Sequence, residues 1–534
     1  MLSRLPPAVL DRVIKKLRKR DLKALSRVSK HLHAVVAGAL WQSITIKPRS
    51  EDELHRMVVA ALAQIPLDYA RRLQFCAGVQ RVTADRCPHA HEDEFLSDSD
   101  DEEESDSEYH WDLGTCISSE ILGIGGIIPL RQPLIRSLSL TTDSTCRFFY
   151  DREYNIDLSP FRQLRCLRWR APQADNLAAV SDAIRNNSSH LQKLELDFVK
   201  WSNLHQNLGY FSDEEDEEGI TAQNYFARAV LRLDKHSPCP LLPEIRVLSL
   251  TQVPLVASMA NAINFSTLAS LTLRMCFGWD DFLERAVQLN VSPKLKSLEI
   301  QDSESVSSEF WDKILEDFLA TFEGLEELFI YQPGPTSTLH LWECISNHHA
   351  SLKRLVHHQR IINTDEASPY FEEEHDLPDL SIRGHDLRRI SEDPSLNPLA
   401  KLDLEFIGLS CVPERLSGSD LKHYASWAVS RNSNQANPST RSNETRSSLS
   451  LRDEFGQFAD WVFGPEGIPS LQSVVFGDFA HGGRVTLHNL LCHRCVDGGS
   501  NYRLIGDYGP EWIEVRDEYR YAMEACPAEP LLGG

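Results

Sequence analysis

A pattern of six residues recurs along most of the chain, with apolar side chains at its first, fourth and sixth positions. Its copies begin at Ala70, Ile135, Leu164, Leu191, Ile245, Leu268, Leu295, Leu325, Leu352, Leu399 and Leu471. The alternation of the last apolar positions predicts a short strand with one buried face. Successive copies are often 27 residues apart, as from Leu164 to Leu191. Such spacing predicts a repeat architecture in which neighbouring strands stack into a continuous core.

The segments between these copies carry apolar residues at helical spacing. They include "LHRMVVAALAQI", "NLAAVSDAIRN", "QNYFARAVLRL", "DDFLERAVQL" and "FWDKILEDFLATF". Each segment would return the chain to the start of the next strand. We therefore expect a curved parallel sheet with helices along its outer side.

Strand side chains alternate between two faces, so the residues between the buried leucines should line the concave face of that sheet. These candidate substrate-facing residues are Arg168, Arg170, Glu195, Asp197, Arg274, Glu299, Phe329, Tyr331, Asp403 and Glu405. The face runs from basic through mixed to aromatic and acidic. A varied face of this kind suits one particular protein partner, since binding hot spots favour Tyr and Arg. Ordinary solvated strand residues are the alternative interpretation.

Three segments interrupt the repeats. Residues 92–108 and 212–218 are acidic runs that repel themselves, and residues 429–450 are polar and of low complexity. We expect disordered insertions at about 90–112, 210–220 and 428–452. Four serines in the acidic runs have an acidic residue three positions later, as acidophilic kinases require: Ser97, Ser99, Ser105 and Ser212.

The first 48 residues have a different pattern, which predicts three short helices. Apolar residues at positions 9, 10, 13, 14 and 17 share one face of a first helix. Asp21 is placed to cap a second helix, which carries Leu22, Leu25, Val28 and Leu32 as one stripe. A third helical piece is "HAVVAGALW". Since so small a core is rarely stable alone, the segment is expected to be completed by a partner.

Charge separates this segment from the rest of the chain. Residues 1–48 hold eleven Lys and Arg against Asp11 and Asp21, a net of +9, whereas the whole chain carries −23. The basic head suits an acidic partner, or "KKLRKR" could serve as a nuclear-import signal. The acidic body argues against nucleic acid as the main ligand. No long apolar run suggests a membrane segment, and the scattered cysteines suggest reduced thiols, so we expect the cytoplasm, the nucleus or both.

The N-terminal landmarks resemble an F-box: Leu-Pro at the start, Asp-Leu opening the second helix, Val-Ser-basic in the middle of that helix, and Leu-Trp at the end. The resemblance implies docking onto the Skp-type adaptor, and through it the cullin and RING subunits, of a ubiquitin ligase. The residues that would form or support this contact are Leu5, Pro6, Val9, Ile14, Leu22, Leu25, Val28, Ser29, Leu32, Leu40 and Trp41.

With its repeats, the chain resembles F-box/leucine-rich-repeat proteins, particularly the irregular fungal type. The segment from "FGDFAHGGR" to "MEACP" also resembles the usual ending of that group. The fold expected is α/β: an F-box over residues 1–48, then an irregular leucine-rich-repeat solenoid over residues 49–528. The function implied is a substrate-recognition subunit of an SCF-type ligase. The alternative is a scaffold that delivers no substrate for degradation.

The sequence signals for a metal site or a catalytic site are weak. Cys492 and Cys495 form a lone CxxC, with His488 close before it. The second ligand pair of a structural zinc site is missing from the sequence nearby. Two histidine pairs, His348–His349 and His357–His358, are expected in ordinary loops. No motif of a hydrolase, metalloprotease or phosphate-binding loop occurs. The sequence therefore predicts a non-catalytic chain with no cofactor and no metal.

Overall fold

The computed structural model describes nineteen stretches of the chain. These are residues 7–14, 16–46, 71–75, 119–142, 156–199, 201, 219–233, 240–302, 308–332, 338–358, 401–410, 455–456, 459–460, 462–465, 467–477, 479–480, 489–495, 501–506 and 509–527. The predicted insertions 92–108, 212–218 and 429–450 lie outside them, as do Leu5, Pro6 and His488. The chain divides into two compact units, Met1–Pro254 with Ala262–Asn264, and Leu255–Asn261 with Phe265–Gly534.

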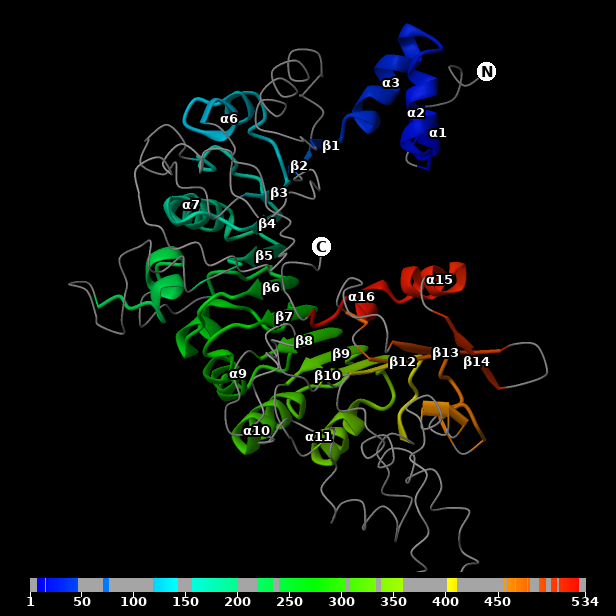
Figure 1. The fold of residues 1–534 in the computed structure, drawn as a ribbon. Coiled ribbons are helices and arrows are strands. Elements are labelled where there is room, and N and C mark those ends of the chain that lie inside the picture. Colours follow the sequence, from blue (N-terminus) through cyan, green and yellow to red (C-terminus); the bar gives the residue numbers. More distant parts are fainter. Residues whose placement is uncertain are drawn as a thin grey trace, which may run out of the picture. The chain divides into compact units, whose positions relative to one another are not determined.

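The first unit begins with three helices and continues with parallel strands, each paired with the next (Figure 1). The helices are α1 (Pro7–Ile14), α2 (Lys19–Ser26), α3 (Lys30–Leu40), α5 (Ser119–Leu122), α6 (Ile127–Arg131) and α7 (Leu177–Asn187), with the short turns η7 (Ala174–Asn176) and η8 (Phe226–Val230). The strands are β1 (Ser43–Ile46), β2 (Arg72–Phe75), β3 (Ser137–Thr141), β4 (Cys166–Arg170), β5 (Lys193–Asp197) and β6 (Val247–Thr251).

The second unit continues the same plan and ends differently. Its parallel strands are β7 (Ser270–Arg274), β8 (Ser297–Gln301), β9 (Glu327–Tyr331), β10 (Arg354–His358), β11 (Phe406–Ser410) and β12 (Ser473–Phe476). Two antiparallel strands follow, β13 (Leu490–Arg494) and β14 (Tyr502–Ile505). The helices are α9 (Trp279–Gln288), α10 (Ser308–Leu319), α11 (Thr338–Ile345), α15 (Pro510–Glu518) and α16 (Arg520–Met523), with η9 (Ala257–Ala262) and η10 (Ser346–His348).

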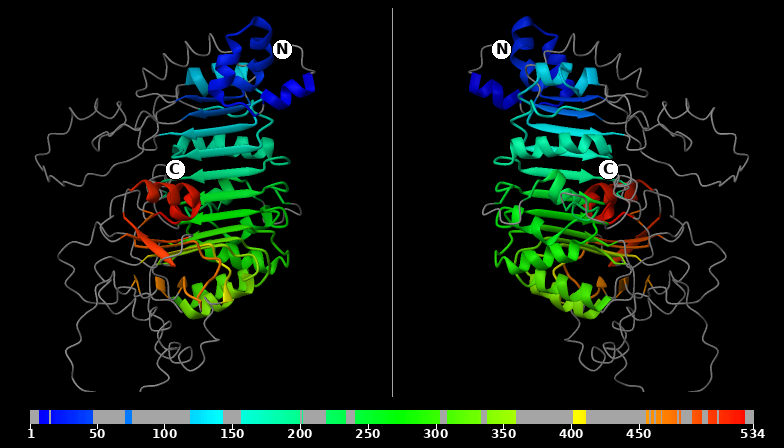
Figure 2. Two further views of the ribbon diagram at one scale, coloured as in Figure 1. Left: turned by 90° about the vertical axis from the view of Figure 1, so that its right-hand side faces the viewer. Right: turned by 90° about the vertical axis from the view of Figure 1, so that its left-hand side faces the viewer.

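Each unit forms a layer of helices against a sheet, and the views in Figure 2 show α7 on one face of the first sheet and α9, α10 and α11 on one face of the second. We call the opposite side of each sheet its inner face. The helices pack through buried apolar side chains, such as Val180 and Ile184 in α7 and Phe282 in α9. Phe265 joins the helical layer of the second unit by ring contacts to Phe282 and Phe318. The mixed α/β class is therefore confirmed.

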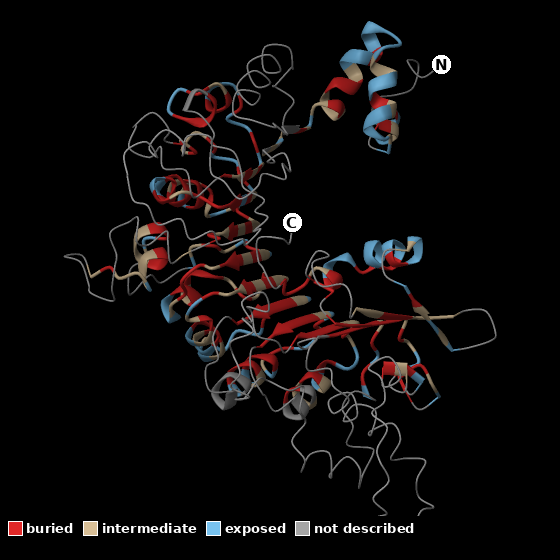
Figure 3. Ribbon diagram, viewed as in Figure 1, coloured by how far each residue is buried: buried red, intermediate tan, exposed pale blue. Residues whose placement is uncertain are grey.

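The predicted sequence pattern locates nearly all of these parallel strands. Wherever the first apolar residue of a copy is described, it is fully buried and the strand begins two residues after it, as Leu164 precedes β4 and Leu295 precedes β8. The next two apolar positions point to the same side, so Leu167 and Trp169 of β4 are also fully buried. In Figure 3 the strands are coloured mainly red and tan, for buried and intermediate residues.

The copy predicted at Leu399 is wrong in register. Strand β11 begins at Phe406, so the copy that forms it starts at Leu404 and continues through Ile407 and Leu409, all buried. The backbone confirms this register, because Phe406 lies opposite Arg354 and the N–H of Glu405 donates to the carbonyl of Lys353 at 2.7 Å. Two overlapping apolar patterns occur five residues apart here, and packing selects the second one.

Within the described residues, no helix is both long and apolar enough to cross a lipid bilayer.

Candidate functional site

The N-terminal helices α1, α2 and α3 enclose a small apolar core of their own. Its buried members are Leu10, Ile14, Leu22, Val36 and Leu40. Leu17, Leu25, Val35, Ala39 and Trp41 pack against it while keeping part of their surface in solvent. Because this core holds so few side chains, an external surface that covers its edges would add to its stability.

Helix boundaries differ slightly from the sequence prediction. Helix α2 begins at Lys19, so Asp21 lies in its first turn and is not its N-cap. A carboxylate in that position still interacts favourably with the partial positive charge of the helix start. The capping residue that sequence reasoning missed is Ser29, whose Oγ accepts a hydrogen bond from the N–H of Leu32 at 3.2 Å and starts α3. A serine three residues before an apolar stripe is the signal that marks it.

The predicted adaptor-binding residues separate into two groups by their burial. Ile14, Leu22, Leu32 and Leu40 are buried, so they support the module from inside. Val9 and Val28 are 44% and 70% exposed, and are apolar side chains of the kind that a partner covers. Ser29 is also exposed, and Leu25 and Trp41 are intermediate. Leu5 and Pro6 are outside the described residues.

The basic head forms a charged surface on the same module. Six exposed cationic side chains lie in and beside α2: Arg18, Lys19, Arg20, Lys23, Arg27 and Lys30. Lys19 Nζ donates to the carbonyl of Ser43 at 3.1 Å, and Arg20 lies 3.9 Å from Asp21, whereas the other four form no ion pair within the described residues. The surface around Val28 is therefore apolar at its centre and positive at its rim.

Comparison with known protein families finds a match to these N-terminal helices. The model of the family described as F-box-like matches residues 2–47, and an F-box-like domain therefore occupies the N-terminus of the chain. F-box domains generally bind Skp-type adaptors and are generally non-catalytic. The match covers less than a tenth of the 534 residues. Among curated proteins, none matches this sequence.

The inner face of the first unit carries four of the predicted substrate-facing residues. Arg168 Nε lies 3.6 Å from Glu195, and Arg170 Nε lies 3.4 Å from Asp197 on the neighbouring strand. Lys193 Nζ also contacts Glu195, at 2.8 Å. Arg168 is exposed, whereas Arg170 retains only 8% of its surface. These four side chains are thus brought together across β4 and β5 as two ion pairs.

The inner face of the second unit does not have the open surface that the sequence predicts. Glu299, Phe329 and Tyr331 are 6%, 3% and 0% exposed, because the chain's own C-terminal segment covers them. Arg274 keeps a partly exposed side chain and pairs with Glu299 in a bidentate contact at 2.8 and 3.0 Å. Asp403 and Glu405 were predicted to lie in a strand, but they precede β11, because the strand begins at Phe406. Lys353 Nζ contacts Asp403 at 2.6 Å.

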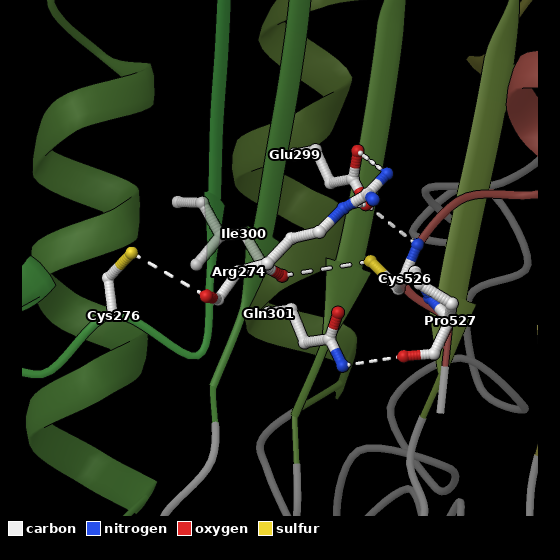
Figure 4. A network of polar contacts seen from close by, with 7 residues as sticks. All are labelled: Arg274, Cys276, Glu299, Ile300, Gln301, Cys526 and Pro527. Atoms are coloured by element: carbon white, nitrogen blue, oxygen red, sulfur yellow. Dashed lines mark hydrogen bonds and ion pairs between the residues drawn. The ribbon is translucent and has the colours of Figure 1, made fainter. Parts of the chain in front are cut away.

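The covering segment is anchored by polar contacts at the strand ends, shown in Figure 4. Glu299 Oε1 accepts the backbone N–H of Cys526 at 2.7 Å. Gln301 Nε2 donates to the carbonyl of Pro527 at 2.8 Å. These contacts provide hydrogen-bond partners for the buried carboxylate of Glu299 and the buried Nε2 of Gln301.

Apolar packing completes the cover. Helices α15 and α16 contribute Trp512, Val515, Tyr519, Ala522 and Met523 to one cluster with the strands. The ring of Tyr519 stacks on Phe406, with ring centroids 5.0 Å apart. This cover was not predicted from the sequence, although the sequence contains a signal for it. The inner positions of β9 and β10 hold bulky side chains, whereas those of β3 hold small ones. The bulky residues are Phe329, Tyr331, Val356 and His358, and the small ones are Ser137, Ser139 and Thr141.

Among the histidines and cysteines considered as metal ligands, His348, His357, His358 and Cys492 are buried inside the protein. His357 and His358 lie in β10 and not in a loop, and burial lowers the pKa of His357 to about 4, so its ring is neutral at pH 7. His348 Nε2 lies 3.1 Å from the carbonyl of Leu319. Cys492 is buried in β13. Among the described residues, no group of three or more His, Cys, Asp and Glu side chains is arranged to hold a metal ion.

Proposed function

We propose that this chain is the substrate-recognition subunit of an SCF-type cullin–RING ubiquitin ligase. The F-box-like domain at residues 2–47 is the observation that carries the proposal. Its role would be to hold the Skp-type adaptor, which connects the chain to the cullin and RING subunits. The repeated strands would hold a substrate protein.

The surface of the module supports the first part of this proposal. Val9 and Val28 are exposed apolar anchors, and the surrounding Lys and Arg suit an acidic adaptor. The buried residues Ile14, Leu22 and Leu40 hold the helices in place beneath them. Partner binding would cover the exposed valines and enlarge the apolar core.

The body of the chain supports the second part. Its parallel strands follow buried apolar residues at a fixed offset, which favours an irregular leucine-rich-repeat solenoid of the type seen in F-box/leucine-rich-repeat proteins. Such arrays use varied strand residues to bind one partner. The chain would promote ubiquitin transfer by proximity alone, since tethering raises the effective concentration of the substrate near the conjugating enzyme.

A pull-down with the Skp-type adaptor tests the proposal. The variant Val9→Asp with Val28→Asp places charge on the exposed surface without touching the core, and we expect its adaptor binding to fall by at least about tenfold. Leu32 is a poorer choice, because it is buried and Leu32→Asp would unfold α3. The matched control is Val291→Asp, at a valine that is 39% exposed in the second unit.

Equal binding by the wild type and the double variant would contradict this assignment of the surface, and no binding by the wild type would contradict the adaptor assignment itself. A second readout separates a receptor from a scaffold. If the chain is a receptor, its deletion raises the steady-state level of the proteins it captures. Unchanged levels with intact adaptor binding would favour the scaffold.

A further inference from the structure

The chain enters each parallel strand through a residue that occupies the same structural position in successive repeats. This entry position immediately precedes the first residue of the strand, and for β2 to β6 of the first unit it holds Arg71, Arg136, Arg165, Gln192 and Arg246. Backbone hydrogen bonds join neighbours along this line: the N–H of Arg165 donates to the carbonyl of Arg136 at 2.7 Å, and the N–H of Arg246 to the carbonyl of Gln192 at 2.8 Å.

The charge of the entry position differs between the two units. In the second unit the entry positions of β7 and β12 are the neutral Ala269 and Gln472, and between them the charge alternates in sign through Lys296, Glu326, Lys353 and Glu405. Its cations are neutralised there, since Lys296 Nζ lies 2.8 Å from Glu326 and Lys353 Nζ lies 2.6 Å from Asp403. In the first unit the entry position carries positive charge and no acidic residue.

Three side chains of the first unit therefore form an uncompensated positive line, which we name the arginine column: Arg136, Arg165 and Arg246. All three are exposed, and none forms an ion pair within the described part of the chain. Glu244, two residues before Arg246, is exposed, and Glu195 is already engaged by Arg168 and Lys193. An exposed positive line is unusual in a chain whose net charge is −23.

We propose that the arginine column is a docking surface for an acidic, Asp- and Glu-rich segment of a substrate protein. This inference rests on the proposed function, since it names the substrate chemistry of the same receptor. The column runs from β3 to β6, which is three strand spacings of about 4.8 Å, so it spans about 14 Å, the length of about four residues of extended chain. Guanidinium groups bind carboxylates through charge-assisted, bidentate contacts.

A polypeptide fits this surface better than a nucleic acid. Single-stranded nucleic acids bind where aromatic rings stack on their bases beside a basic groove. The strand residues that follow the column are Ser137, Cys166 and Val247, none of which is aromatic. The acidic body of the chain would also repel a long polyanion, whereas a short acidic segment meets mainly the local positive field.

Fluorescence anisotropy with a defined probe tests this inference on the full chain. The probe is a labelled twelve-residue peptide of alternating Glu and Ser, with a Gln-for-Glu peptide and a twelve-nucleotide single-stranded RNA as comparisons. We expect the Glu peptide to bind and the Gln peptide not to bind. In the triple variant Arg136→Gln, Arg165→Gln, Arg246→Gln, the affinity for the Glu peptide should fall by at least about tenfold.

Two further triple variants control for net charge and folding. Arg503→Gln, Arg516→Gln, Arg520→Gln makes the same change of charge at exposed arginines of the second unit and should leave peptide affinity unchanged. Arg136→Lys, Arg165→Lys, Arg246→Lys should restore only part of the binding, because lysine keeps the charge and loses the bidentate contact. Circular dichroism on each variant verifies that the fold is retained.

Three results would overturn the inference: no binding of the Glu peptide by the wild type, equal loss in both Gln triples, or tighter binding of the RNA that depends on the column. An adaptor pull-down on the same preparations keeps the two proposals separate. Retained adaptor binding with no peptide binding would reject the arginine column while leaving the adaptor assignment intact.

Discussion

At the scale of single residues, Glu299 is a buried polar group of the second unit with partners on two other segments. Its carboxylate holds Arg274 with two hydrogen bonds and also accepts the backbone N–H of Cys526. Glu299 is 6% exposed, so water cannot replace these partners. One side chain thus connects two strands of the sheet to the C-terminal segment that covers them (Figure 4).

The change Glu299→Ala should lower the free energy of unfolding by about 3 kcal/mol, because it leaves a partly buried guanidinium and a buried N–H without their acceptor. Urea denaturation followed by circular dichroism measures this. The matched control is Glu326→Ala, which removes an exposed ion pair with Lys296 and should cost less than about 1 kcal/mol. Similar costs for the two variants would show that the C-terminal segment does not depend on Glu299.

At the scale of elements, the sequence predicts strands better than it predicts their surroundings. The buried apolar residues at Leu164, Leu191 and Leu295 each place a strand correctly, because one buried residue per copy fixes the register. The strand β11 was misplaced because two apolar patterns overlap at Leu399 and Leu404. The covering helices α15 and α16 were missed, since a contact between distant segments leaves no local period in the sequence.

Gly408 provides a test of the corrected register of β11. A Cβ at this residue would lie 2.6 Å from the ring of Phe479 and 3.1 Å from a methyl group of Val356. The change Gly408→Ala should therefore lower the free energy of unfolding by about 1–3 kcal/mol through overpacking. Gly456→Ala is the matched control, because a Cβ there meets no atom within 4 Å in the described part of the chain.

Thermal and urea unfolding of both glycine variants would decide between the two registers. In the register first predicted, Gly408 would follow the strand as a loop residue and would tolerate alanine. A cost confined to Gly408→Ala supports the strand at Phe406–Ser410, whereas equal stability of both variants would contradict it.

For the candidate adaptor surface, the apolar sequence pattern predicts the helical module but not which of its residues are exposed. The apolar stripes and the Leu-Trp ending identified the three-helix module, but they did not separate supporting residues from contacts. Burial makes that separation: Ile14 and Leu22 are inside, and Val9 and Val28 are outside. Val28 lies in the turn between α2 and α3, so the helical period that places it on one stripe with Leu22 does not apply to it.

At the scale of the whole molecule, charge is strongly segregated along the sequence. The first 48 residues carry +9, and the chain as a whole carries −23. A net charge of this size keeps a protein soluble, and a local region of opposite sign attracts partners that the rest repels. Long-range attraction of this kind mainly accelerates association, whereas apolar contacts mainly determine how long a complex lasts.

The variant Lys23→Gln, Arg27→Gln, Lys30→Gln should therefore slow adaptor association severalfold while changing its dissociation little. These exposed side chains lie at the rim of the surface around Val28 and form no ion pair within the described residues. Surface plasmon resonance at about 0.05 M and about 0.5 M salt measures both rates, since the range of charge interactions shrinks from about 14 Å to about 4 Å between them.

The wild type should lose its kinetic advantage over the variant at the higher salt concentration, because screening removes the steering that the three charges provide. The variant Val9→Asp, Val28→Asp should show the opposite behaviour, with dissociation accelerated at both salt concentrations. If the charge variant instead changed dissociation as strongly as the valine variant does, the cations would belong to the buried contact itself. The basic head would then act as part of the interface and not as a long-range attractor.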